Sequence, residues 1–250
     1  MKTLSALGYC PSYGERHIYT ESMHYMNRQP FAPGEWYHCY SRGVDKRITF
    51  EGEHDYMRFM QLLYLANSTE CLHRSEVFLN KQTDIFQIDR KKRLVSIGSY
   101  CLMPNHFHLL LKDESEDGTG ISKFMQRVGT AYAMYFNIPR ERTGNLFVKP
   151  FRSKHVGENE YFKRVSNYIH FNPIELWEKG WKEGRVENWQ DLLSTLKEYP
   201  YSSLIDYEAG SARPEAAILD FESMDLIRSG SVSLREALLE ANEYYASLRV

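Results

Sequence analysis

Apolar residues recur at helical spacing along several parts of the chain. In residues 53–67 they stand at i, i+3, i+4, i+7 and i+8, and residues 121–137 and 233–248 have a similar spacing on one side. Residues 159–171 complete a set of four predicted helices. This segment ends before Asn172, because Asn172 precedes a proline and such a residue is disfavoured in the helical conformation.

Four other segments have the composition or the alternation of strands. They are residues 35–43, 94–103, 106–112 and 145–156. Pro104-Asn105 predicts a tight turn, so the second and third strands should pair antiparallel. The order β-α-β-β-α-β, followed by a further helix, is that of the ferredoxin-like, split β-α-β arrangement. We therefore predict an α+β fold with an antiparallel sheet and a C-terminal helical extension.

The same pattern divides the 250 residues into three parts. Residues 1–30 are polar and aromatic with weak periodicity, and we expect an N-terminal extension there. Residues 31–207 hold the helices and strands of one domain, with a polar segment at 68–92 that is a loop or a short inserted helix. Residues 208–250 form an acidic C-terminal extension that includes the last predicted helix.

Hydropathy and cysteine spacing indicate a cytoplasmic protein. No window approaches about eighteen consecutive apolar residues, so no membrane span is expected. The apolar stretch at the N-terminus is too short for a signal peptide. The four cysteines are widely spaced and include no Cys-x-x-Cys pair, which is typical of scattered, reduced thiols.

Charge is distributed unevenly along the chain. The formal net charge of −2 argues against indiscriminate binding of nucleic acid through bulk charge. Between Lys123 and Arg164, however, nine basic residues stand against three acidic ones, whereas from Asp206 onward nine acidic residues stand against four arginines. The middle of the chain could therefore carry a basic face that the net charge does not reveal, because the acidic extension offsets it. A solvated surface of mixed charge is the alternative.

Two histidines in the third predicted strand are the first candidates for chemistry. His106 and His108 stand at i and i+2, so their side chains project to one face while Phe107 turns into a core. Two imidazoles side by side on a rigid strand make half of a divalent-metal site. A strand with two half-buried histidines is the alternative, because His-x-His is a short pattern.

The third predicted helix places Tyr168 and Asn172 on one face, at i and i+4. The Asn172 side-chain oxygen is an adequate third ligand beside two imidazoles. The Tyr168 hydroxyl can attack phosphorus and form a covalent phosphotyrosine, with the metal polarising the scissile phosphate. Transfer of the phosphate to tyrosine keeps the energy of the phosphodiester bond, which hydrolysis would lose. A 3′-hydroxyl can therefore later reverse the transfer. Alternatively, Tyr168 is a core tyrosine and Asn172 caps the helix.

Basic and aromatic side chains around these segments are candidates for contact with nucleic acid. The candidate phosphate contacts are Arg42, Lys149, Arg152, Lys154, Lys163 and Arg164. Trp36, Tyr37 and Phe151 are candidates for stacking on unpaired bases. His170 is expected to be structural, whereas the role of His38 stays open.

Five segments, taken in order, resemble a known family. They are Gly-Glu-Trp-Tyr-His at 34–38 with Arg-Gly at 42–43, Met-Pro-Asn-His-Phe-His-Leu-Leu at 103–110, Gly-Asn-Leu-Phe at 144–147 with Pro-Phe-Arg at 150–152, Tyr-Ile-His-Phe-Asn-Pro at 168–173, and Tyr-Pro-Tyr-Ser-Ser at 199–203. Over roughly residues 31–207 the chain is similar to the single-tyrosine HUH transposases of the insertion-sequence 200 type. Within that superfamily it most resembles the REP-associated tyrosine transposases.

The resemblance implies cleavage and rejoining of single-stranded DNA through a 5′-phosphotyrosine, with Mg²⁺ or Mn²⁺. It implies that His106 and His108 are metal ligands, that Asn172 is the third ligand and that Tyr168 is the nucleophile. The implied partner is single-stranded DNA with palindromic hairpins, bound by a monomer or a homodimer in the bacterial cytoplasm, at the nucleoid. The mildly acidic charge and the long N-terminal extension depart from the family pattern.

Other functions are compatible with parts of the pattern. A catalytically silent protein that binds hairpin DNA and regulates would keep the fold, although the full His-His-Tyr-Asn set favours an enzyme. An HUH replication initiator or relaxase would lack the Tyr-Ile-x-x-Asn-Pro helix, and a metal-dependent phosphodiesterase would carry an Asp/Glu cluster. The acidic extension is a candidate autoinhibitor, covering the basic face by mimicking phosphate.

Overall fold

The computed structural model describes residues 30–70, 84–157, 159–187, 189–207, 213–220 and 234–248. The predicted N-terminal extension therefore lies outside the described residues, apart from its last residue, as do the middle of the polar segment at 68–92 and much of the acidic extension. In the described ranges no helix has both the length and the apolar character that a membrane span requires. The predicted division into three parts stays a prediction.

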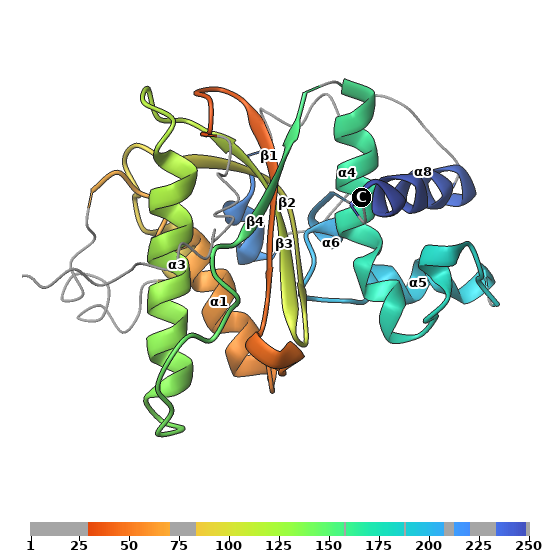
Figure 1. Cartoon of the computed structure of the whole chain (residues 1–250), viewed down its shortest axis with the longest axis horizontal. Coiled ribbons are helices and arrows are strands. Elements are labelled where there is room, and N and C mark those ends of the chain that lie inside the picture. The colour runs from red at the N-terminus through yellow and green to blue at the C-terminus, as the bar shows by residue number, and fades with distance from the viewer. Residues whose placement is uncertain are drawn as a thin grey trace, which may run out of the picture.

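Four strands form one antiparallel sheet in the order β2-β3-β1-β4 (Figure 1). The strands are β1 (Trp36–Arg42), β2 (Val95–Met103), β3 (His106–Asp113) and β4 (Arg152–Val156). Pro104 and Asn105 form the turn between β2 and β3, as predicted. This strand order, with one helix after β1 and another after β3, is the split β-α-β arrangement. The predicted ferredoxin-like fold is confirmed.

Helices connect and cover the strands. The α-helices are α1 (Glu53–Leu65), α3 (Gly120–Asn137), α4 (Asn159–Phe171), α5 (Trp189–Lys197), α6 (Leu204–Tyr207) and α8 (Leu234–Ser247). The 3₁₀ turns are η1 (Val44–Lys46), η2 (Ile85–Gln87), η3 (Asn172–Leu176), η4 (Trp181–Glu183) and η5 (Pro214–Ile218). The four helices predicted from the sequence are α1, α3, α4 and α8. Helix α4 has the predicted bounds, because Asn172 opens a 3₁₀ turn with a proline at its first positions.

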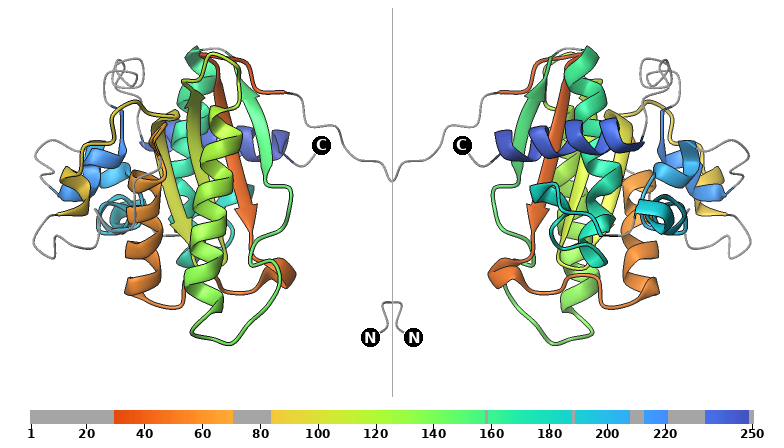
Figure 2. Two further views of the ribbon diagram at one scale, coloured as in Figure 1. Left: turned by 90° about the vertical axis from the view of Figure 1, so that its left-hand side faces the viewer. Right: turned by 90° about the vertical axis from the view of Figure 1, so that its right-hand side faces the viewer.

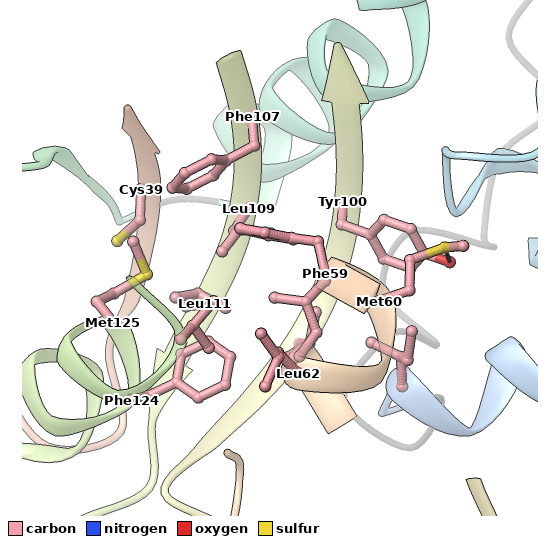
Figure 3. Packing of buried hydrophobic residues seen from close by; sticks show 14 of the residues in the cluster. Cys39, Phe59, Met60, Leu62, Tyr100, Phe107, Leu109, Leu111, Phe124 and Met125 are labelled. Atoms are coloured by element: carbon pink, nitrogen blue, oxygen red, sulfur yellow. Dashed lines mark hydrogen bonds between the residues drawn. The ribbon is translucent and has the colours of Figure 1, made fainter. Parts of the chain in front are cut away.

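Helices α1 and α3 cover one face of the sheet, where they enclose the larger core (Figure 3). Alternate residues of β3, namely Phe107, Leu109 and Leu111, point into it, as the period of two residues in a strand requires. They meet Phe59 of α1 and Phe124 of α3, and the rings of Phe59 and Phe107 lie 5.1 Å apart. Phe107 is therefore the core residue that the sequence predicts between the two histidines.

Helices α4 and α8 lie on the opposite face of the sheet and against each other (Figure 2). They enclose a second core, to which Leu110 of β3, Val165 and Ile169 of α4, and Leu238 and Ala241 of α8 contribute. The side chains of His106 and His108 share the face of Leu110, because they stand at even positions from it. The histidines consequently face α4.

The predicted strand at 145–156 is too long, since β4 begins only at Arg152. Upstream of it, Phe147 makes an isolated bridge to Gly43, and the Val148 N–H donates to the Arg42 carbonyl at 2.8 Å. Pro150 has no N–H to offer to the ladder, so regular pairing starts after it. Residues 147–151, before β4, therefore run beside the sheet and are not part of its regular ladder.

Residues 199–203 lie along the outer edge of β2. The Leu102 N–H donates to the Tyr201 carbonyl and the Ser203 N–H to the Tyr100 carbonyl, each at 2.9 Å. The Ser203 hydroxyl also contacts Nε2 of His170 at 2.9 Å. The segment packs back on the domain, as predicted, and the buried His170 joins it to α4.

Candidate metal and tyrosine site

His106 and His108 lie side by side on β3, on the face that α4 covers. Both are buried, with 8% and 5% of their surface exposed. Their ring centroids are 5.1 Å apart and their planes are nearly perpendicular. The shared face predicted from the spacing of the two residues is what the structure has.

The ring of His106 is held by Asn105, in the turn before β3. Nδ1 of His106 lies 2.6 Å from Oδ1 of Asn105, and the other end of that amide donates to the Lys46 carbonyl at 3.2 Å. Because the amide nitrogen already has an acceptor, its oxygen must face His106 and accept the Nδ1–H. Nε2 of His106 is then left with a lone pair.

Asn172 presents its oxygen to this lone pair. Its Nδ2 donates to the Tyr168 carbonyl at 3.2 Å, while Oδ1 lies 3.3 Å from Nε2 of His106. Burial lowers the pKa of His106 to about 4, so the imidazole is neutral at pH 7 and has one N–H for two acceptor contacts. The shorter contact to Asn105 takes that proton. Two acceptor atoms, Nε2 of His106 and Oδ1 of Asn172, therefore face each other, and both are donor types that divalent cations bind.

His108 is supported by a second imidazole, that of His38 on β1. Nδ1 of His108 lies 2.8 Å from Nε2 of His38, whose Nδ1 lies 2.6 Å from the Tyr244 hydroxyl on α8. If Nε2 of His108 binds a metal, its proton sits on Nδ1 and is donated to His38. His38 must then donate from Nδ1 to Tyr244. In that arrangement His38, whose role the sequence leaves open, would orient His108.

Burial is the main cause of the shifted pKa values in this site. It lowers the pKa of His38 to about 3 and that of His108 well below its ordinary value. Charge interactions with His38 and His106, and then with Lys182 and Arg42, lower the pKa of His108 further. All three imidazoles are neutral at physiological pH. Neutral imidazole is the form that binds metal.

Tyr168 stands beside these imidazoles on α4. Its ring is edge-on to His108 at 5.4 Å and to His38 at 5.8 Å between centroids. Only 2% of its surface is exposed, and burial raises the pKa of its hydroxyl, against a smaller opposite effect of the contact with Asn172. The structure thus brings together the four predicted residues, His106, His108, Tyr168 and Asn172. Their roles stay a proposal.

In the described part of the chain, no group of three or more His, Cys, Asp or Glu side chains could hold a metal ion. The arrangement above is of a different kind, since it has two imidazoles and an amide oxygen as donors. Such a set leaves coordination positions for a phosphate oxygen and water. The residues present therefore fit a divalent cation with open positions.

Comparison with known proteins gives a family match and a similar solved structure. The family model described as transposase IS200 like matches residues 67–172, a span that holds both histidines, the tyrosine and the asparagine. The predicted resemblance to IS200-like transposases is confirmed. Among solved structures, a REP-associated tyrosine transposase bound to a REP hairpin is similar, with 12% sequence identity, a TM-score of 0.40, and coverage of 72% of this chain and 82% of that chain. No curated protein matches the sequence.

Helix α8 lies beyond the IS200-like span and covers the tyrosine. The rings of Tyr244 and Tyr245 lie 5.3 and 6.1 Å from that of Tyr168, and the second pair is stacked. On the inner side, the ring of Trp181 lies 6.3 Å away. DNA therefore cannot reach the Tyr168 hydroxyl in this arrangement without movement of a covering side chain or of α8.

Two of the predicted phosphate contacts interact with α8. Nζ of Lys154 donates to the Ser247 hydroxyl at 2.8 Å, and Arg164 lies 3.4 Å from the Glu243 carboxylate. Helix α8 of the acidic extension thus contacts two of the predicted basic residues, and the autoinhibitor hypothesis stays a prediction. The tyrosines of α8, which phosphate mimicry does not predict, cover Tyr168.

The other four basic residues lie in three places. Arg42 and Arg152 are exposed at the ends of β1 and β4, where strand alternation directs them to the histidine face. Lys163 is half-buried on α4. Lys149 is exposed in the segment before β4 and lines a pocket on the opposite face of the sheet, so the structure separates it from the histidines.

The structure corrects the prediction that Tyr37 stacks on bases, and it shows what Trp36 packs against. Tyr37 is buried in the larger core and its hydroxyl accepts the Ala32 N–H at 2.8 Å, so it cannot stack on bases. Trp36 packs edge-on against Phe162 of α4 at 4.9 Å. Sequence reasoning missed Tyr244, because helical spacing in the last segment does not show which of its residues meets a histidine 206 positions away.

Proposed function

We propose that this chain cleaves and rejoins single-stranded DNA at hairpins, as the REP-associated transposases it resembles are expected to do. Tyr168 is the nucleophile, and His106, His108 and Asn172 hold Mg²⁺ or Mn²⁺. The match to IS200-like transposases supports a transposase-related function. The observation that carries the finer proposal is the pair of acceptor atoms, Nε2 of His106 and Oδ1 of Asn172, which lie 3.3 Å apart. Asn172 is four residues after Tyr168, and its amide donates to the Tyr168 carbonyl.

In the step assigned to Tyr168, one phosphorus–oxygen bond forms while another breaks. The Tyr168 oxygen forms a bond to the scissile phosphorus while the bond from phosphorus to the 3′-oxygen breaks, and the phenol proton is balanced by the proton that the departing 3′-oxygen gains. The 5′-phosphate of the downstream strand is then esterified to the protein. A 3′-hydroxyl can attack the same phosphorus and restore a DNA strand. A bound divalent cation would supply Lewis-acid polarisation of the phosphate.

The chain's own residues prepare this step. Asn105 and His38 orient the two imidazoles, so little reorganisation is needed when the ligands are used. Arg42 and Arg152, at the exposed border of the histidine face, are suited to the phosphates on either side of the scissile one. Lys154 and Arg164 become available for the same purpose when α8 leaves them.

A second candidate function is favoured by one observation. Tyr168 is 2% exposed beneath the tyrosines of α8, which would suit a silent protein that binds hairpin DNA and regulates. The two functions share the fold and the partner. They differ in whether a covalent adduct forms.

A denaturing gel distinguishes them. Single-stranded hairpin DNA from the gene's own flanks, labelled at the 5′ or the 3′ end, is incubated with the protein and Mn²⁺, Mg²⁺ or EDTA. We expect a metal-dependent adduct that carries the 3′ label only, because the tyrosine takes the 5′-phosphate of the downstream fragment. Binding without an adduct, on several flanking sequences and with both metals, would support the regulatory function instead.

The matched variants lie on one helix. Tyr168→Phe should abolish the adduct while the fold and DNA binding remain. Tyr161→Phe removes a hydroxyl from the same helix two turns earlier and should leave the adduct unchanged. An adduct that persists in Tyr168→Phe and is lost in Tyr161→Phe would overturn the assignment of the nucleophile.

A further inference from the structure

A pocket of about 370 Å³ lies on the face of the sheet opposite the histidines, between α3 and the segment before β4. Its size falls at the lower end of the range for small-molecule sites, about 300 to 1,000 Å³. Phe107 forms part of its lining, and the neighbours of Phe107 on β3 are His106 and His108 (Figure 3 shows Phe107 on this side of β3). The pocket therefore lies directly behind the candidate metal site.

The pocket has an apolar wall and a polar wall. Aromatic rings on the sheet side include those of Phe147 and Phe151, while α3 presents the exposed polar side chains of Ser122, Gln126 and Thr130. Flat apolar surfaces beside hydroxyl and amide groups suit a planar ring with polar edges. A nucleobase has that form, and stacking on aromatic side chains is how proteins commonly hold unpaired bases.

Gly129 of α3 lines the pocket, and the fold gives no reason for a glycine there. It stands inside an eighteen-residue helix, where glycine is unfavourable relative to alanine. A Cβ at this position would meet no atom within 4 Å. A large side chain at this position would fill the pocket, whereas glycine leaves room for an occupant.

Charge favours a nucleotide as that occupant. Lys149 is the one charged residue among those that line the pocket, and it is exposed. Arg152 follows three residues later, on the histidine side of the edge strand β4. A strand of DNA could thus pass over this edge with one base in the pocket and its phosphates along Lys149 and Arg152.

We propose that this pocket, formed by α3, Phe107 and residues 147–151, binds an unpaired base of the DNA substrate. The proposal rests on the proposed function, since it takes the same DNA as ligand. It assigns to the face behind the histidines the task of fixing the unpaired strand while the phosphate is presented on the other face.

Two substitutions at Gly129 test the proposal with little change to the helix. Gly129→Ala leaves the pocket open and Gly129→Leu fills it, and both residues are good helix formers. Fluorescence anisotropy in EDTA measures binding of labelled hairpins from the gene's flanks, with the unpaired nucleotides present or removed, and thermal unfolding confirms the fold. We expect Gly129→Ala to bind as the unchanged protein does. Gly129→Leu should bind the hairpin with unpaired nucleotides about tenfold more weakly, as loss of one stacked base implies.

Equal affinity of the two variants for the hairpin with unpaired nucleotides would overturn the proposal, and would indicate that the pocket receives another occupant, such as a side chain of a partner protein. A measurement without variants covers the case in which Gly129→Leu unfolds. Hairpins with 5-iodouracil at successive unpaired positions are photocrosslinked to the unchanged protein. Crosslinks to the peptide that contains Phe147 or Phe151 support the pocket, and crosslinks confined to other peptides overturn it.

The outcome is separable from that of the proposed function. An adduct on Tyr168 together with equal binding by the two Gly129 variants would leave the transferase in place and remove the pocket. Weaker binding by Gly129→Leu without an adduct on any flank would keep the pocket and remove the transferase.

Discussion

The Tyr244 hydroxyl lies 2.6 Å from Nδ1 of His38, which in turn contacts His108 at 2.8 Å. A residue of the last helix thus supports a candidate metal ligand across a sequence separation of 206 positions. In the arrangement that leaves Nε2 of His108 for a metal, Tyr244 accepts the proton of His38. The C-terminal helix is therefore both the cover of the tyrosine and part of the support of the histidines.

Tyr244→Phe should weaken metal binding. The substitution leaves the Nδ1–H of His38 buried without an acceptor, at a cost of about 1 to 3 kcal/mol. Loss of outer-shell partners typically lowers metal affinity by about 10- to 100-fold, and we expect the lower end here because Tyr244 is one residue further out. Mn²⁺ binding followed by electron paramagnetic resonance gives the affinity. Tyr161→Phe, which touches the ring of Tyr244, is the control, and equal affinities in the two variants would contradict the prediction.

Asn172→Ala should lower the affinity for Mn²⁺ by at least about tenfold, because one of three donors is lost. Asn167→Ala is a matched control, since Asn167 lies on the same helix and contacts Glu240 at 3.4 Å instead of a histidine. Isothermal titration at pH 7.5 measures both. Unchanged binding in Asn172→Ala would remove the amide from the ligand set.

Stability in EDTA should fall as the pH is lowered through the range from about 6.5 to about 3. Burial lowers the pKa of His38, His106 and His170 to about 3, 4 and 3, from an ordinary value of 6.5. The unfolded chain therefore takes up protons first, and protonation favours unfolding. Thermal unfolding between pH 7.5 and 4.5 should show a falling midpoint. His170→Asn should reduce the slope, and a midpoint that is constant over this range would contradict the burial of neutral imidazoles.

Glu243→Lys should increase adduct formation by about two- to fivefold. The substitution replaces an ion pair with Arg164, which is partly exposed and worth up to about 1 kcal/mol, by repulsion between like charges, so α8 is held less firmly. Tyr244 and its contact with His38 remain available. Glu240→Lys makes the same change of charge one turn earlier, beside Asn167, and serves as the control. An equal rate of adduct formation in the two variants would argue against α8 as a barrier.

The sequence was sufficient for the features that depend on local period. The alternation along β3 places His106 and His108 on one face, and the proline after Asn172 ends α4 where predicted. It was not sufficient where distant segments meet. The pairing of Tyr244 with His38 depends on how α8 crosses α4. The separation of Lys149 from the histidines depends on a segment that joins the sheet only after Pro150. Neither path is encoded in the spacing of apolar residues.

If His108 binds a metal as proposed, the chain of contacts from His108 through His38 to Tyr244 couples two equilibria, metal binding and docking of α8. Linkage is reciprocal, so the factor by which the docked helix tightens the metal is also the factor by which the metal tightens the docked helix. DNA that lifts α8 must overcome that factor. The rate of strand cleavage should consequently pass through an optimum as the metal concentration rises, because saturating metal would hold the cover in place.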